Sequence, residues 1–551
     1  MAWIALATVV ALLLFGLFVP VYTDEIGWRF QERAGIDGID MMINDVCGHN
    51  TLATPPWFML PVRWFSAAAN TALPSPLYVR IEGTGCALLW LTLLLQIIRL
   101  GTARHGERSY LTMLAAGLIG MGLLPLLMVM SRPEQPLIIC TTAMVIIALA
   151  QGRDDRASNF VLPLKVAGVV ALAAIALSYH LKGVLYSPVA AACIVTCRPG
   201  RHAVVSKVAG LACLIALTAL AAAYWTSRFS CPGDPVLAAK LAHQNVLVML
   251  GRPSEYLRHL PGLFLNALPQ RYVALTVPAE MQMSGWIPAH TFPAWVAFVF
   301  GPLQILVWTT AIGMAALSLM LFAARHGVRA VLEVRFAAPL AILACVLVWG
   351  FSQNIKNDYE AAHVLPLLAL AIVLSATLAE PAGAIPRLLH GLAPVAVALT
   401  MISTLVVVIY CVGPLTRAAG SPGFPPNQLY SVANFHFGQI RRDAYNAMQR
   451  AHFPKRRLRR VLVDDTTYFI LQGSYLPLHR LGVIETWVGR NTDPVVYLVS
   501  RRSDGIVMGC KLLPQALQDV AVRSGAVCAV NASTLRAMVS AASSRDAERE
   551  L

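Results

Sequence analysis

Long apolar runs repeat through the first three quarters of this sequence and restrict most strongly what the chain can fold into. Many have about the length of roughly 20 residues that a helix needs to cross a bilayer. Hydrophobic residues make up 57% of the 551 residues and charged residues only 13%, against roughly 25% charged residues in soluble domains. The sequence therefore predicts an α-helical polytopic membrane protein.

About eleven apolar segments are expected to be transmembrane helices. They are residues 3–20, 84–100, 110–130, 133–150, 161–178, 183–197, 206–225, 292–322, 336–352, 363–380 and 392–412. The first has no basic stretch before it and no small-residue cleavage site after it, so we interpret it as an uncleaved anchor.

The Lys and Arg residues of the short loops predict the orientation of the chain. One set of short loops is rich in Arg, whereas each loop of the opposite set carries a single cation: Arg132, Lys182 or Lys356. Because cytoplasmic loops are the ones enriched in basic residues, the N-terminus is expected in the cytoplasm. An odd number of crossings then places the segments 21–83 and 226–291 on the outer side, together with the C-terminal tail.

The tail has the character of a soluble domain. Two stretches, RRVLVDD (459–465) and DPVVYLVS (493–500), are typical of buried strands, and LLPQALQDVAVRSG (512–525) of a helix. A small extracytoplasmic α/β domain is therefore expected. The predicted organisation is a membrane module over 1–412, a linker over 413–428 and a periplasmic domain over 429–551.

Four of the eleven cysteines lie outside the expected spans, on the side that permits disulfides. The pairs Cys510–Cys528, within the tail, and Cys47–Cys231, between two outer loops, are both compatible with these positions. The net charge of +15 is explained by basic loops and the KRRLRR stretch at 455–460. Without any nucleic-acid-binding motif, it does not indicate a nucleic-acid partner.

Two adjacent acids, Asp24 and Glu25, follow directly on the first apolar segment in a chain that has few acids. Carboxylates at a membrane boundary are costly to desolvate, so such a pair usually has partners or a function. Position alone is equally compatible with a solvated helix end.

The sequence around this pair, YTDEIGWRFQERAGIDG (22–38), resembles the start of the first outer loop in the GT-C superfamily of membrane glycosyltransferases. The resemblance is to the branch of the protein O-mannosyltransferases and the lipid A aminoarabinose transferase. It implies that Asp24 is the catalytic residue, that Glu25 is its companion, and that the reaction inverts the anomeric centre.

Four later segments resemble the same family in the same order, over roughly residues 1–412. They are TPPWFMLPVRWF (54–65), SRPEQPLIICTTAMVIIALAQGR (131–153), YHLKGVLYSPVAAACIVTCRPGR (179–201) and NIKNDYEAAHVLPLLALA (354–371). The family's Lys before the Pro-Pro pair is Thr54 here, which leaves the identity of the donor open. The tail has no counterpart in the resemblance.

A carboxylate at Asp24 and the outer cations would have complementary roles in a glycosyl transfer. A carboxylate can accept the proton of an acceptor hydroxyl or amine as it attacks an anomeric carbon, and cations stabilise a leaving polyprenyl phosphate. Arg132, Lys182, Lys356 and His363 are the candidate phosphate-binding residues. Snorkelling to lipid headgroups explains the cations equally simply, and Glu134 is expected to pair with neighbouring bases.

Metal binding is left open by the sequence. Asp37 and Asp40 are three residues apart, so they share a face if this part is helical. With Asp24 they can bind a divalent cation, but a solvated helix face explains the same spacing. No other cofactor is indicated.

Together these patterns predict an inverting glycosyltransferase of a bacterial inner membrane. It would move a sugar from a polyprenyl-phosphate donor to a lipid, glycan or protein acceptor at the periplasmic face. The alternative is a transporter, flippase or polymerase of lipid-linked glycans. Transporters are typically built from internal repeats, and no internal repeat is visible here. A receptor-like scaffold with a partner-binding tail is the third option.

Overall fold

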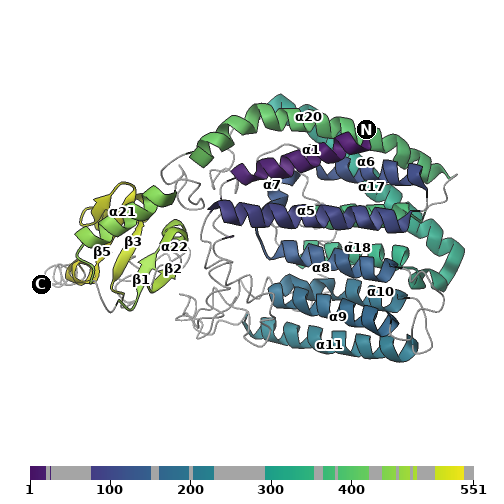
Figure 1. Cartoon of the computed structure of the whole chain (residues 1–551), viewed down its shortest axis with the longest axis horizontal. Coiled ribbons are helices and arrows are strands. Elements are labelled where there is room, and N and C mark those ends of the chain that lie inside the picture. Colours follow the sequence, from purple (N-terminus) through teal and green to yellow (C-terminus); the bar gives the residue numbers. More distant parts are fainter. Residues whose placement is uncertain are drawn as a thin grey trace, which may run out of the picture.

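The computed structural model consists of a helical module and a small C-terminal domain beyond one end of it (Figure 1). The chain is mostly helical. The structure describes residues 1–19, 21, 25, 76–102, 104–150, 161–197, 203–228, 292–352, 364–378, 383–420, 437–454, 458–471, 476–480 and 503–538.

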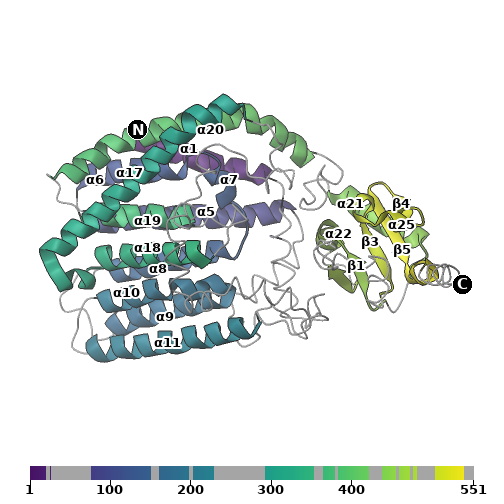
Figure 2. The same cartoon turned by 180° about the vertical axis from the view of Figure 1, so that it is seen from behind.

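Each of the eleven expected apolar segments coincides with a helix, and the helices lie side by side in the module (Figures 1 and 2). Five helices among the described residues are long and apolar enough to cross a membrane, and five further apolar helices are shorter. The main helices are α1 (Ala2–Phe15), α5 (Pro76–Gly101), α6 (His105–Ile119), α8 (Glu134–Leu149), α9 (Val161–Tyr179), α10 (Ser187–Thr196), α11 (Ala203–Arg228), α17 (Ala294–His326), α18 (Val334–Ser352), α19 (Val364–Ala376) and α20 (Ala384–Gly420).

Small residues allow α6 and α20 to approach closely. A Cβ added at Gly117 would lie 2.7 Å from the Cβ of Ala396, and one at Gly120 would lie 2.4 Å from Thr400 Cγ2. The Thr400 hydroxyl donates to the Gly117 carbonyl at 2.6 Å. Small residues at such crossings let helix backbones pack tightly, which is the main source of helix association in a membrane.

Several helix boundaries differ from the sequence-based expectation, and two of them affect the site and the linker. Helix α5 begins at Pro76, eight residues before the expected start at 84, because the polar pair Arg80 and Glu82 belongs to its first turns. Helix α20 continues to Gly420, so the first eight residues of the expected linker are helical. Hydropathy marks the apolar centre of each helix and misses these polar ends.

The C-terminal domain is built on a mixed sheet of five strands in the order β2-β1-β3-β5-β4. Strand β1 pairs in parallel with β2 and β3, and β5 pairs antiparallel with β3 and β4. The helix α21 (Phe437–Arg450) packs against β4 and β5. The strands are β1 (Val461–Val463), β2 (Leu478–Arg480), β3 (Gly505–Gly509), β4 (Val522–Ser524) and β5 (Val527–Asn531).

The expected strand in 459–465 is present as β1, but the helix expected over 512–525 is wrong. Only Gln515–Gln518 is helical there, and Val522–Ser524 forms β4. The antiparallel pairing of β4 with β5 is a tertiary contact, and it outweighs the helical pattern of the local sequence. The strand expected over 493–500 lies outside the described residues.

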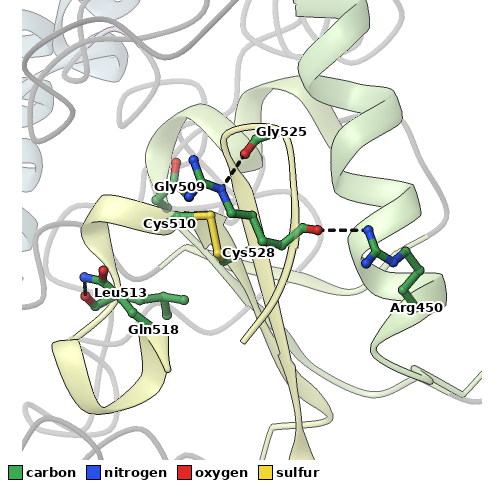
Figure 3. Close-up of a disulfide and its surroundings, with 9 residues drawn as sticks. Arg450, Gly509, Cys510, Leu513, Gln518, Gly525 and Cys528 are labelled. Carbon is green, nitrogen blue, oxygen red and sulfur yellow. Dashed lines mark hydrogen bonds between the residues drawn. A yellow bond between two sulfur atoms is a disulfide. The ribbon is translucent and has the colours of Figure 1, made fainter. Parts of the chain in front are cut away.

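A disulfide joins Cys510, just after β3, to Cys528 in β5 (Figure 3). Its two cysteines lie 18 residues apart in the chain. The Cys510–Cys528 pair that the sequence allows is therefore present, whereas Cys47 and Cys231 lie outside the described residues. The same part of the sheet is tied to α21, because Arg450 donates to the Arg523 carbonyl at 3.0 Å.

The C-terminal domain packs against the end of the helical module where α1 ends and α5 begins. Val21, after α1, and Val79, in α5, share an apolar cluster with Ile440 and Phe453 of the C-terminal domain. All four side chains are buried. This contact places the C-terminal domain beside the end of α1 and the start of α5.

Cys510 and Cys528 are predicted to resist alkylation until the protein is reduced. In denatured, unreduced protein a maleimide reagent should label Cys213, an exposed free thiol, and leave these two unlabelled. Replacing both by Ser should destabilise the C-terminal domain by about 3 kcal/mol, because the loop entropy of its unfolded state is no longer restricted. Mass spectrometry of labelled peptides measures the first effect. Labelling of both cysteines without reductant would contradict the disulfide.

Candidate functional site

The turn between α7 (Leu124–Met128) and α8 is packed directly on the start of α5. A Cβ added at Gly83 would lie only 1.9 Å from the carbonyl oxygen of Val129, so the two backbones are in contact. Gln135 fixes the same junction, since its Nε2 donates to the Gly83 carbonyl at 2.8 Å and to the Met128 carbonyl at 2.6 Å. The turn is therefore held rigidly against α5.

A buried ion pair joins this turn to the segment that follows α1. The carboxylate of Glu25 accepts two hydrogen bonds from the guanidinium of Arg80, one of them from Nη1 to Oε1 at 2.7 Å. The Glu25 side chain is 0% exposed and that of Arg80 is 1% exposed. Two buried charges of opposite sign are tolerated only when both are well paired and hydrogen-bonded.

Backbone groups complete the environment of this pair. Arg80 Nε donates to the Val19 carbonyl at 2.6 Å, and Arg80 Nη1 donates to the Val129 carbonyl at 3.0 Å. Glu25 Oε1 accepts from the backbone N–H of Ser131 at 2.7 Å. The pair thus connects three segments that are far apart in the sequence: the end of α1, the start of α5 and the turn before α8.

A second charged cluster begins one residue further along the same turn. Glu134 Oε2 accepts from Arg132 Nε at 3.1 Å, and Glu134 Oε1 accepts from Lys182 Nζ at 2.7 Å and from Arg132 Nη2 at 3.2 Å. The three side chains are between 6% and 12% exposed. Glu134 therefore neutralises one of two cations, and the three side chains together carry one positive charge.

The position of Lys182 is fixed by the short helix η3 (Leu181–Tyr186). A Cβ added to Gly183 would lie 2.5 Å from the Ala176 carbonyl, so this turn packs tightly on the end of α9. The Lys182 backbone N–H donates to Nδ1 of His180 at 3.1 Å. With Nδ1 acting as acceptor, the proton of the neutral imidazole is on Nε2.

The structure brings together three of the residues that the sequence indicates. Glu25 is bonded to the backbone of Ser131, whose chain neighbour Arg132 shares Glu134 with Lys182. The expected pairing of Glu134 with neighbouring bases is confirmed. Five further candidates lie outside the described residues: Asp24, Asp37, Asp40, Lys356 and His363.

Arg80 is the important residue that sequence reasoning missed. The sequence predicts a helix only from residue 84, so Arg80 falls in the expected outer loop 21–83. An arginine in such a loop is not a sign of a site. The available signal was a charged residue within a few positions of an apolar helix, where a buried charge requires a partner. Its partner, Glu25, lies 55 positions earlier, which no local pattern reveals.

Metal binding has no support within the described residues, where no group of three or more His, Cys, Asp or Glu side chains can hold an ion. The carboxylates that the structure describes near this site are already paired with cations. Glu25 is bonded to Arg80, and Glu134 is bonded to Arg132 and Lys182.

No family model and no curated protein matches the sequence. Among solved structures, ArnT from Cupriavidus metallidurans bound to undecaprenyl phosphate aligns over 96% of this chain and 97% of its own, with 13% identity and a TM-score of 0.46. Its apo state gives the same identity and TM-score. AglB from Archaeoglobus fulgidus, in complex with an inhibitory peptide and a dolichol-phosphate, aligns over 92% of this chain and 69% of its own, with 10% identity and a TM-score of 0.41.

Both alignments extend over more than nine tenths of this chain. At these identities and TM-scores the likeness carries no argument about donor, acceptor or catalytic residues.

Gly83→Ala is predicted to destabilise the protein, because its new Cβ would collide with the Val129 backbone. Overpacking of this kind costs about 1–3 kcal/mol. Gly85→Ala is the matched control in the same helix, since nothing lies within 4 Å of its added Cβ and alanine favours a helix by about 1 kcal/mol. Thermal unfolding in detergent should show a lower Tm for the first variant only. Equal Tm values would contradict the close backbone contact.

Arg80→Met is predicted to be strongly destabilising, because it leaves the buried carboxylate of Glu25 without its cation. Breaking a buried pair in this way costs about 3–5 kcal/mol. The double variant Arg80→Met with Glu25→Leu removes both charges and should recover part of the lost stability. Thermal unfolding of the parent, the single variant and the double variant measures this coupling. A single variant as stable as the parent would refute the buried pair.

Proposed function

We propose that this chain is an inverting glycosyltransferase that moves a sugar from a polyprenyl-phosphate donor to a lipid, glycan or protein acceptor. The observation that carries the proposal is the connection of the two clusters. Glu25, the residue after Asp24, is bonded to the turn that bears Arg132, and Arg132 shares a carboxylate with Lys182. Glu25, the chain neighbour of the candidate general base, and two candidate phosphate-binding cations thus belong to one connected set of contacts.

Asp24 is proposed as the catalytic base and Glu25 as the residue that positions it. Consecutive Cα atoms are about 3.8 Å apart, so fixing Glu25 limits where the carboxylate of Asp24 can lie. The carboxylate of Glu25 accepts hydrogen bonds from Arg80 and from the backbone N–H of Ser131. In this proposal each of the two adjacent acids has its own role: Asp24 accepts the proton and Glu25 holds Asp24 in place.

Arg132 and Lys182 are proposed to bind the donor phosphate, with Lys356 and His363 as further contacts from another outer turn. A cation and an anion 4 Å apart interact by about 1 kcal/mol in bulk water and about 4 kcal/mol at an effective dielectric of 20. The low exposure of Arg132 and Lys182 favours the larger value.

The proposed reaction is a single displacement. The acceptor oxygen or nitrogen forms a bond to the anomeric carbon as the bond from that carbon to the phosphate oxygen breaks. The acceptor proton goes to Asp24, and the electron pair of the broken bond leaves on the phosphate, where the cations stabilise it. The products are the inverted glycoside and a polyprenyl phosphate.

The side of the membrane is proposed from the disulfide. Cys510–Cys528 lies in the domain that packs at the same end of the helical module as Glu25 and Arg80. Disulfides form and persist in oxidising compartments such as the bacterial periplasm. We therefore place the site at the periplasmic face of an inner membrane, with the N-terminus in the cytoplasm.

The decisive assay supplies purified protein with radiolabelled polyprenyl-phosphate sugars and an envelope extract as the source of acceptors. Asp24→Asn is expected to lower the transfer rate by about 10²–10⁴-fold, the usual contribution of a general base. Asp519→Asn, at an exposed carboxylate of the C-terminal domain, is the control and should transfer at the parent rate.

Two results would overturn this proposal in different ways. Full activity of Asp24→Asn would remove Asp24 from the mechanism. Movement of intact donor across proteoliposomes, with no transfer by the parent protein, would favour the transporter alternative. Circular dichroism and size-exclusion profiles matching the parent establish that each variant is folded.

A further inference from the structure

We propose that Lys165 and Lys207 form a binding site for the phosphate headgroup of an anionic phospholipid. Each is the fifth residue of its helix, Lys165 in α9 and Lys207 in α11. The site is far from Glu134, because Glu134 begins α8 and Lys165 bonds to Ala150, the residue that ends it. A helix of 16 residues is about 24 Å long. The inference does not depend on the proposed glycosyl transfer.

Four helices converge beside these two lysines. A Cβ added at Gly210 of α11 would lie 2.3 Å from Val166 Cγ1 of α9 and 3.7 Å from Ile194 Cγ2 of α10. A Cβ added at Gly168 of α9 would lie 3.3 Å from Ile147 Cδ1 of α8. The helices α8, α9, α10 and α11 lie side by side in both views (Figures 1 and 2). The two lysines therefore belong to one junction between packed helices.

Each lysine binds the C-terminal end of a neighbouring helix. Lys165 Nζ donates to the carbonyl of Ala150, which caps α8, and Lys207 Nζ donates at 2.6 Å to the carbonyl of Val195, in the last turn of α10. Helix C-termini favour such cations. The buried Cys197, which follows α10, lies within electrostatic range of both ammonium groups. The two positive charges thus lie near the same point.

An anion can still be bound at this cation pair. No carboxylate bonds to either lysine within the part of the chain that the structure describes. Each printed bond uses one of the three N–H donors of an ammonium group. The segments that join these helices, QGRDDRASNF (151–160) and RPGRH (198–202), contain four arginines and two aspartates. Basic sites between transmembrane helices are typical binding sites of anionic lipid headgroups.

The surroundings favour a phospholipid over a free phosphate ion. Leu164 is 74% exposed, Val204 75% and Val208 60%, and all three are close in sequence to one of the lysines. They belong to α9 and α11, which are long and apolar enough to cross a membrane. Their side chains would contact acyl chains, while the half-buried lysines extend toward the headgroups. In the orientation proposed for this chain, the lipid belongs to the cytoplasmic leaflet.

The test measures which lipids the purified full-length protein retains in detergent. Phosphatidylglycerol, with one net negative charge, and phosphatidylcholine, with none, are added with identical acyl chains, and native mass spectrometry counts the adducts. The parent should prefer phosphatidylglycerol. Lys165→Gln and Lys207→Gln should each lower this preference by roughly fivefold, the contribution of one cation near an anionic headgroup. A general loss of structure would affect both lipids alike and leave their ratio unchanged.

Arg387→Gln is the matched control, and Lys165→Arg tests the role of charge. Arg387 is an exposed cation near the start of α20, and its Nε donates to the Gly383 carbonyl at 3.2 Å. Both variants should keep the parent preference. An unchanged preference in both Lys→Gln variants would leave helix capping as the role of the lysines and overturn the lipid site. An equal loss in Arg387→Gln would indicate diffuse charge attraction and overturn it as well.

Cross-linking locates the lipid even if the lysine variants do not fold. Photoreactive benzoylphenylalanine replaces either Leu164, beside the site, or Leu388, which is 56% exposed in α20. Phosphatidylglycerol should be cross-linked in preference to phosphatidylcholine at the first position and not at the second. The same preference at both positions, or at neither, would overturn the inference. Sugar transfer enters neither measurement, so the glycosyltransferase proposal is tested separately.

Discussion

The buried ion pair between Glu25 and Arg80 is the interaction on which the proposed site depends. Neither side chain is exposed to water, and each also forms hydrogen bonds with backbone groups of other segments. Such a pair is costly to bury and costly to break. Its bonds hold the end of α1, the start of α5 and the turn before α8 together.

The same turn carries the second cluster, so the two sets of charges cannot move independently. Ser131 binds Glu25 through its backbone, and the next residue, Arg132, binds Glu134 together with Lys182. The close contact of Gly83 with Val129 leaves little freedom at this junction. Such rigidity favours a site that must hold a phosphate and a nucleophile at fixed positions, because even a small misplacement of the reacting groups lowers the reaction rate.

The sequence predicted the fold class well because hydropathy is a local property. Apolar runs located the helices, and the two cysteines of the tail lay where a disulfide could form. Helix starts were less accurate, since the polar first turns of α5, with Arg80, carry no hydropathy signal. The segment 512–525 was predicted as a helix and contains β4, because pairing with β5 is a tertiary contact.

The site was predictable only in part for a related reason. Single outer cations drew attention to Arg132 and Lys182, and the paired acids drew attention to Glu25. The pairing of Glu25 with Arg80 spans 55 positions, and the sharing of Glu134 by Lys182 spans 48. Only the fold brings such residues together, so no spacing rule could have identified either pair.

The most direct measurement of the central claim is an experimental structure of the protein with a bound polyprenyl phosphate. The account predicts phosphate oxygens within about 3 Å of Arg132 or Lys182 nitrogen atoms, in a chamber that the Asp24 carboxylate also faces. A phosphate bound far from both cations, or an Asp24 side chain in an unrelated crevice, would contradict it.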